Sequence, residues 1–256
     1  MSTITKRELR EQRRAARREA ERAEAARQAR RRRARLLAIV TGLAAVLVVA
    51  AVAISSSSSS GGGAAPAPRA SSLFAGIPER NGVLGDPEAP LTVTEFVDLQ
   101  CPICAEASSS TLPALVDDYV RTGKVKLEAR TLSFLGPDSV EAARVAAAAE
   151  RQGRLWPFLE AFYAGQGAEN SGYVTDDFLR GVASAAGVDA DAALAEADST
   201  FAQRRLGRAD ADAARLGIDA TPTFTVARGD GSPRVLDADA LDPASVAAAL
   251  DRELAR

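Results

Sequence analysis

The stretch DLQCPICAEA, residues 98–107, contains both cysteines of this 256-residue chain. Cys101 and Cys104 are separated by two residues, so they form a CxxC motif. Such a pair is compatible with three roles: half of a metal site, a structural disulfide, or a redox catalyst. The rest of the sequence distinguishes between these roles.

The chain contains no histidine. This excludes Cys–His and Ser–His–Asp catalysis and any metal site that needs an imidazole. Two thiolates supply half of a tetrahedral zinc shell, so a metal site would have to be shared between two chains. A disulfide across four residues constrains the unfolded chain little. We therefore favour redox catalysis, and expect no metal and no cofactor other than a redox-active Cys101–Cys104 disulfide.

Charge divides the chain into two parts. Residues 1–35 hold 14 Lys and Arg against five Glu, a net charge of +9, whereas the remainder has a net charge of −11. We interpret residues 1–35 as a basic cytoplasmic tail beside anionic lipid headgroups rather than a nucleic-acid-binding arm. Residues 36–54, LLAIVTGLAAVLVVAAVAI, lack charge. Nineteen residues nearly span a hydrocarbon core of about 30 Å, so they predict a transmembrane helix.

The flanking charges predict the orientation of this helix. Arg30–Arg33 and Arg35 come directly before it, which places the N-terminus in the cytoplasm and the rest outside. We therefore predict a single-pass cell-membrane protein with an extracytoplasmic catalytic domain. The alternative is a signal peptide cleaved after Ala53. Residues 55–76, rich in Ser, Gly and Pro, are expected to form a flexible linker.

The remaining residues, 77–256, have the pattern of an α/β domain. Strands are predicted at 91–99 and 124–132, and a helix is predicted between them, from Pro102 to Gly123, with a kink before Pro113. Residues 138–216 are expected to be helical, with breaks at Gly153, 165–172, Gly187 and Gly217. A β-hairpin over 223–236 and a helix from 242 to 254 complete the domain. In a strand–helix–strand context, a CxxC motif is typical of redox function.

The two cysteines are expected to differ in reactivity. Cys101 lies at the start of the predicted helix, where free N–H groups and the helix dipole stabilise a thiolate. That position predicts a lowered pKa and a nucleophilic role. Cys104 lies one turn further on the same face, where it can resolve a mixed disulfide. Pro102 fixes the backbone between them.

Two further segments are candidates for the site. Val93, Glu95 and Val97 share one face of the first strand, so Glu95 is expected to be buried beneath the cysteines, with a raised pKa suited to proton transfer. The alternative is a partly solvated Glu95 at a sheet edge. In ATPTFTV, residues 220–226, Pro222 is expected to begin a strand; local physics does not determine whether its peptide bond is cis.

These segments together resemble a known family. EFVDLQCPICAE (95–106), a following strand, a helical block and TPTF (221–224) are similar to the DsbA-like thiol-disulfide oxidoreductases of the thioredoxin superfamily, and more narrowly to the membrane-tethered actinobacterial proteins. The resemblance covers residues 77–256 and implies a thioredoxin-like fold with a helical insertion at about 138–216.

The resemblance also implies roles for individual residues. Cys101 matches the exposed attacking cysteine, Cys104 the buried resolving one, and Glu95 the buried acid. Pro222 matches the cis-proline that faces the disulfide, and Thr221 the residue before it. Ile103 departs from the best-known oxidases, which have His at this position, so a weaker oxidant is expected.

We expect disulfide formation in exported cysteine-containing proteins. A tethered reductase or isomerase, and a redox-silent binding (holdase) module, remain alternatives. The family implies a quinone-linked DsbB- or VKOR-like membrane partner that reoxidises Cys101–Cys104. We expect a monomer that does not bind nucleic acid.

Overall fold

The computed structural model describes residues 72–256. The chain divides into two units, Met1–Gly63 and Ala64–Arg256, and the described residues belong to the second. The predicted basic tail, the predicted transmembrane helix at 36–54 and most of the predicted linker lie outside the described residues. Between residues 72 and 256, no helix is both long and apolar enough to cross a membrane.

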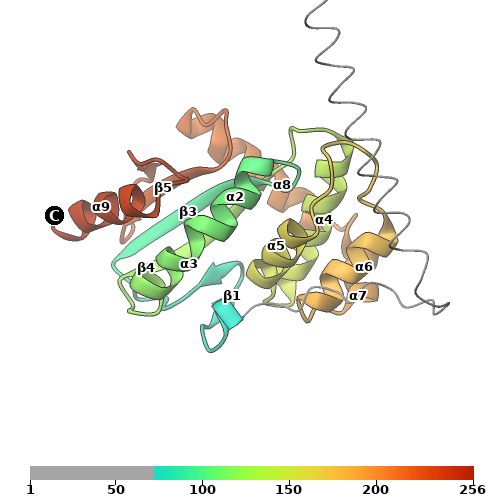
Figure 1. Ribbon diagram of the computed structural model, residues 1–256, viewed down its shortest axis with the longest axis horizontal. Helices are drawn as coiled ribbons and strands as arrows, with labels where there is room; N and C mark the ends of the chain where they lie inside the picture. Colours follow the sequence, from blue (N-terminus) through green and yellow to red (C-terminus); the bar gives the residue numbers. More distant parts are fainter. Residues whose placement is uncertain (1–71) are drawn as a thin grey trace, which may run out of the picture. The chain divides into compact units, whose positions relative to one another are not determined.

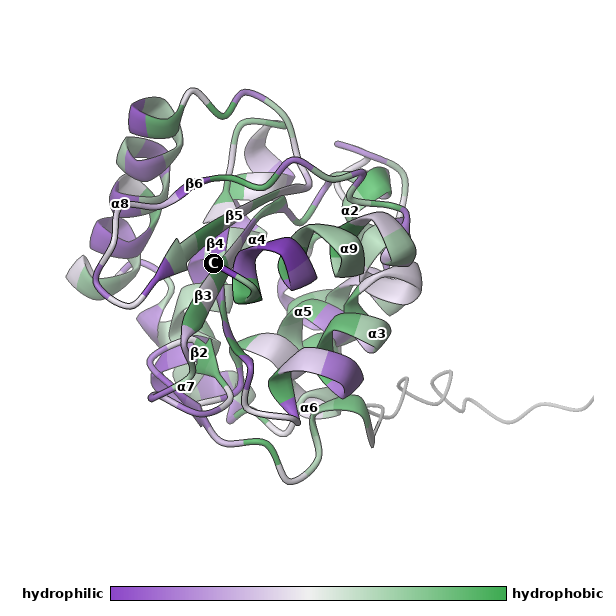
Figure 2. Ribbon diagram, turned by 90° about the vertical axis from the view of Figure 1, so that its left-hand side faces the viewer, coloured by the Kyte–Doolittle hydropathy of each residue, from purple (hydrophilic) through white to green (hydrophobic). Residues whose placement is uncertain are grey.

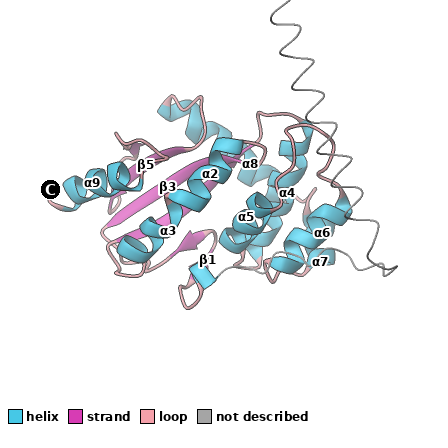
Figure 3. Ribbon diagram, viewed as in Figure 1, coloured by secondary structure: helices cyan, strands magenta, loops and turns pink. Residues whose placement is uncertain are grey.

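A mixed six-stranded sheet lies at the centre of the described residues (Figure 3), in the order β1-β2-β4-β3-β5-β6. Strands β3 and β4 are parallel, β5 is antiparallel to β3, and short antiparallel strands extend both edges. The bounds are β1 Glu79–Arg80, β2 Val83–Leu84, β3 Leu91–Asp98, β4 Val125–Leu132, β5 Thr223–Arg228 and β6 Arg234–Val235. The central position of β3 places the residues that follow it in the middle of the domain.

Helices cover both faces of this sheet. Figure 1 shows α4 to α7 grouped beside the sheet, and Figure 2 shows the sheet between α8 on one side and α2, α3 and α9 on the other. The bounds are η1 Ser72–Phe74, α2 Pro102–Ser110, α3 Leu112–Leu115, η2 Val116–Val120, α4 Pro137–Arg151, α5 Leu155–Ala164, α6 Asp176–Ala185, α7 Ala190–Glu196, α8 Thr200–Leu216 and α9 Pro243–Leu254. The predicted α/β class and the helical insertion between β4 and β5 are confirmed.

The two faces of β3 pack against different layers. Leu91 and Val93 belong to the main core, which also contains residues of α3, α9 and the helical insertion. Phe96 points to the opposite face and packs with Leu132 and two alanines of α8. This alternation follows from the two-residue period of a strand. It places Glu95 on the same face as Val93 and α2.

The kink predicted before Pro113 is confirmed. The helix expected from Pro102 to Gly123 is interrupted at Thr111, because Pro113 lacks an N–H donor and its ring crowds the preceding turn. The chain then continues as α3 and as the π-helical turn η2. The hairpin β1–β2 was not predicted. Asn81 and Gly82 form its turn with φ values of 52° and 75°, which is the left-handed conformation that an Asn-Gly hairpin requires.

Candidate active site

Cys101 caps the amino end of α2. Its backbone is extended, with φ −75° and ψ 116°, and its sulfur accepts a hydrogen bond from the Cys104 backbone N–H at 3.4 Å. When it is protonated, the same thiol donates to the Thr221 carbonyl at 3.4 Å. Cys101 is 6% exposed, so it is buried just below the surface, where the family resemblance implies an exposed cysteine. The predicted position at the helix start is confirmed.

The surroundings of Cys101 stabilise its thiolate. Its pKa is lowered to about 6, chiefly because the Cys104 thiol donates a hydrogen bond to it. Burial acts in the opposite direction, and the backbone N–H groups of Ile103 and Cys104 lower the pKa further. At neutral pH, Cys101 is therefore mostly a thiolate, the form that takes part in thiol-disulfide exchange.

Cys104 has the opposite character. It is fully buried within the cluster that Cys101 and Val97 form. Burial raises its pKa above the usual thiol range, and the hydrogen bond to Cys101 raises it further. The pair therefore consists of one reactive sulfur near the surface and one protonated sulfur inside.

Glu95 lies in the interior beneath the motif. Its side chain is 3% exposed, and its backbone pairs with Ala129 on one side and Phe224 on the other. The prediction of burial is confirmed, whereas a solvated position at a sheet edge is wrong because β3 is central. Burial raises the pKa of Glu95 to about 8.

Glu95 should make the stability of the protein depend on pH. Between about pH 4.5 and pH 8 the unfolded chain has lost this proton and the folded protein keeps it, so Glu95 lowers stability as pH rises. Glu95→Gln should therefore be more stable than the parent at pH 8.5, by on the order of 4 kcal/mol, and the gain should shrink to about 1 kcal/mol at pH 5. Urea unfolding of the parent and of Glu95→Gln, both in the disulfide form, measures the difference in their free energies of unfolding. A gain that is the same at every pH would contradict a titrating Glu95.

The segment before β5 faces Cys101. The Thr221-Pro222 peptide bond is cis, as the family resemblance implies. The Thr221 carbonyl accepts from the Cys101 thiol. The structure thus brings Thr221 and Pro222 to the cysteines although about 120 residues separate them along the chain.

The sequence did not indicate the central role of Asp98. This residue ends β3 and is fully buried. Its carboxylate accepts hydrogen bonds from the backbone N–H groups of Gln100, Phe134 and Leu135 and from the Ser139 hydroxyl. Asp98 therefore joins the loop that precedes Cys101 to the loop between β4 and α4. The only available signal was an acidic residue at the end of a buried strand.

Tyr163, at the end of α5, was also missed. It packs against the cysteine cluster, and its hydroxyl donates to the Asp98 carbonyl at 3.4 Å. Burial raises its pKa well above the usual value.

Apolar side chains are exposed around the site. Ile103 is 44% exposed, and Phe134, on the loop that Asp98 holds, is 52% exposed. Leu135, next to Phe134, packs against the cysteine cluster. Ile103, Phe134 and Leu135, which lie on segments that adjoin the cysteines, are called the apolar rim below.

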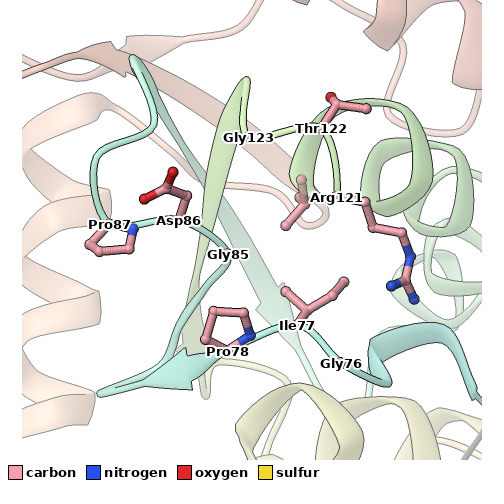
Figure 4. Close-up of a pocket in the computed structure, with 10 residues that line it drawn as sticks. Gly76, Ile77, Pro78, Gly85, Asp86, Pro87, Arg121, Thr122 and Gly123 are labelled. Carbon is pink, nitrogen blue, oxygen red and sulfur yellow. The ribbon is translucent and has the colours of Figure 1, made fainter.

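The cavity in Figure 4 lies elsewhere. It has a volume of about 460 Å³, and residues before β3 and β4, including Asp86 and Gly123, line it. These residues are at the amino ends of the two strands, whereas Cys101 follows the carboxyl end of β3. The eight residues of β3 separate the two regions by roughly 25 Å. The cavity therefore plays no part in the cysteine site.

Comparisons with known proteins agree with this geometry. A family model described as Thioredoxin matches residues 79–241. The Probable disulfide bond formation protein D of Bacillus cereus is 34% identical over 98 residues, which are 38% of this chain and 45% of that protein. A Na(+)/H(+) antiporter NhaA of Herminiimonas arsenicoxydans is 34% identical over 151 residues, 58% of this chain but 22% of that protein. The chain thus spans less than half the length of these two relatives.

Solved structures show the same fold. BdbD from Bacillus subtilis, in its oxidised form, has a TM-score of 0.60 and 23% identity, covering 76% of this chain and all of that one. The alpha-DsbA1 of Wolbachia pipientis has a TM-score of 0.58 and 21% identity, covering 72% and 96%. The family model matches well over half of this chain, and the two solved structures share its fold. The chain therefore belongs to the thioredoxin family.

Proposed function

We propose that this chain is an extracytoplasmic thiol-disulfide oxidoreductase that forms disulfides in exported proteins, with Cys101 and Cys104 as its redox pair. The observation that carries the proposal is the asymmetry of the two thiols: Cys101 has a pKa of about 6 at the amino end of α2, and Cys104 is fully buried. A lowered pKa stabilises the reduced protein, which makes the disulfide a better oxidant.

The proposed reaction transfers the disulfide to a client. A client thiolate attacks the Cys101 sulfur of the oxidised pair, the Cys101–Cys104 bond breaks, and Cys104 leaves as a thiolate. Glu95, neutral at pH 7 because its pKa is about 8, gives Cys104 its proton. A second client thiolate then attacks the client sulfur of the mixed disulfide and releases the Cys101 thiolate. Two client thiols are oxidised and one protein disulfide is reduced.

The apolar rim supports an unfolded polypeptide as the client. Ile103 and Phe134 expose large apolar side chains beside a reactive sulfur, and such surfaces bind apolar segments of partners. Unfolded exported chains present both these segments and free cysteines. The proposed reoxidant, in turn, is a quinone-linked membrane protein of the DsbB or VKOR type, which accepts the two electrons from the reduced pair.

A disulfide-transfer assay tests this function. The oxidised full chain is mixed with a reduced, unfolded client that carries two cysteines. We expect one client disulfide for each protein disulfide lost, at a rate far above that with the same concentration of glutathione disulfide. A rate equal to that of glutathione disulfide would contradict the oxidase. Faster reduction of an oxidised client by the reduced chain would instead identify a reductase, and client binding that survives loss of both cysteines would identify a holdase.

Ile103 provides a test of what determines the reduction potential of the Cys101–Cys104 pair. Its side chain is exposed beside Cys101, so Ile103→His should place a donor near the thiolate and lower its pKa below about 6. The reduction potential should rise by about 30 mV for each unit by which the pKa falls. Equilibration with a glutathione buffer at pH 7 measures it, with Ile103→Phe as a neutral aromatic control. An unchanged or lower potential in Ile103→His would show that the amino end of α2, and not this side chain, determines the reduction potential.

The proposed location places residues 36–54 across the cell membrane and the catalytic domain outside. It rests on the uncharged stretch and the arginines before it. A reporter that is active only outside the cytoplasm, fused after Arg256, should be active. If a reporter active only in the cytoplasm works at the same site, the domain is on the wrong side for exported clients.

A further inference from the structure

The segment between α5 and α6 lies against the loop that carries Cys101. The Gln166 side-chain amide donates to the Leu99 carbonyl at 2.7 Å and to the Cys101 carbonyl at 3.2 Å. The active-site loop also contacts this segment through a side chain of its own. The buried Gln100 side chain donates to the Tyr173 hydroxyl at 2.8 Å and accepts from the Asn170 N–H at 3.0 Å. The helical insertion therefore binds the active-site loop directly.

The two carbonyls that Gln166 holds determine the orientation of Cys101. They lie on either side of Gln100, and the Cys101 carbonyl also accepts from the Cys104 N–H at 3.1 Å and the Ala105 N–H at 3.3 Å, as the first acceptor of α2. The Cys101 carbonyl belongs to the peptide plane that follows Cys101, and the Cys101 N–H, which donates to the Asp98 carbonyl at 3.0 Å, belongs to the plane before it. With both of these planes held, the Cα–Cβ bond of Cys101 has a defined direction. The sulfur then reaches the Cys104 N–H at 3.4 Å, and a rotation that reduces the N–H···S angle would weaken this hydrogen bond.

Gln166 does this without adding charge. Glutamine supplies N–H donors and no charge, so it does not change the electrostatics of a site that already contains Asp98 and Glu95. A charged donor such as Lys would hold the carbonyls and also stabilise the thiolate directly. The influence of Gln166 on Cys101 therefore acts through backbone geometry.

We propose that Gln166 is a positioning residue for Cys101: its amide fixes the Leu99 and Cys101 carbonyls and so holds the Cys101 sulfur against the first N–H groups of α2. The helical insertion thereby tunes the reactivity of the attacking thiol. This inference rests on the proposed function for its biological meaning. Its physical content, the ionisation of Cys101, can be measured without a client.

The test compares two leucine variants of the reduced full chain. Gln166→Leu removes the donors at similar side-chain size. Gln152→Leu is the matched control, because Gln152 also makes two hydrogen bonds with backbone, to Asp189 O at 3.2 Å and from Asp189 N at 2.8 Å, within the helical insertion. The readout is the rate of Cys101 alkylation by iodoacetamide from pH 4.5 to 9, together with the urea unfolding midpoint.

Gln166→Leu should raise the apparent pKa of Cys101 and leave the rate at pH 9 close to that of the parent. A rise from about 6 to about 7 would slow alkylation at pH 6 about fivefold. Gln152→Leu should keep the parent profile even if it loses as much stability. If Gln166→Leu does not fold, Gln166→Met, which is unbranched and also lacks donors, takes its place with the same expectation.

Two outcomes would overturn the inference. If Cys101 in the Gln166 variant is alkylated with the same pH dependence as in the parent, Gln166 only attaches the helical insertion to the active-site loop. If Gln152→Leu shifts the apparent pKa of Cys101 by the same amount, the shift reflects a general loss of stability. Failure of the proposed function is distinguishable from both. In that case the Gln166 variant would change Cys101 alkylation as expected, while the parent would not transfer its disulfide to a client.

Discussion

Cys104→Ala is expected to accumulate covalent complexes with client proteins, whereas Cys101→Ala should accumulate few. In the first variant the Cys101 thiolate still attacks a client disulfide, but no second thiol resolves the mixed disulfide. In the second variant the remaining thiol is fully buried and has a raised pKa, so it reacts slowly. Non-reducing gels of membranes from cells that express each variant show the difference.

The expected contrast is at least tenfold in trapped complexes, because a pKa of about 6 makes Cys101 mostly thiolate at neutral pH while Cys104 remains a thiol. The double variant, with both cysteines replaced by Ala, is the control for non-covalent association and should show no reducible complex. Equal trapping by the two single variants would mean that the assignment of attacking and resolving roles is wrong. Absence of trapping in both would mean that the chain does not exchange disulfides.

Asp98→Ala is expected to be the most destabilising single change near the site, by about 3–5 kcal/mol. The substitution leaves three backbone N–H groups and the Ser139 hydroxyl without their carboxylate acceptor. Each buried donor that loses its partner costs about 1–3 kcal/mol, and bonds to charged acceptors are the stronger ones. Urea unfolding of the disulfide form measures the loss directly.

Asp138→Ala is the matched control for this prediction. The Asp138 carboxylate accepts one hydrogen bond, from the Gly172 N–H in an exposed region, so its loss should cost about 1 kcal/mol or less. Asp98→Asn should fall between the two, because the amide keeps one acceptor oxygen and turns a donor toward the N–H groups. A loss within about 1 kcal/mol of the parent for Asp98→Ala would mean that solvent satisfies these groups and that Asp98 does not organise the loops.

The parts of the site that could be predicted from the sequence depend on local geometry. The position of Cys101 at the start of α2 follows from Pro102 and the strand before it, and the face of Glu95 follows from the period of a strand. The burial of Glu95 needed one long-range fact: β3 pairs with β4 on one side and β5 on the other. The alternation of the strand alone could not exclude an edge position.

The remaining parts of the site depend on contacts between distant segments. Gln166 meets Leu99 and Cys101 across 67 and 65 residues, and Gln100 meets Tyr173 across 73. No periodicity in the sequence indicates which loop of the helical insertion folds back onto the cysteines. The β1–β2 hairpin was missed for a different reason: its strands have two residues each, too short for an alternating pattern, although Asn81-Gly82 marks the turn.

The reduction potential of the Cys101–Cys104 pair tests the central claim most directly. A thiol pKa of about 6 stabilises the reduced protein at pH 7 by about 1.4 kcal/mol relative to an ordinary thiol, which is worth about 30 mV. Equilibration of the full chain with glutathione at pH 7 should therefore give a potential between those of thioredoxin, about −270 mV, and of DsbA, about −120 mV. A potential at or below about −270 mV would contradict the account, because such a pair would act as a reductant toward exported clients.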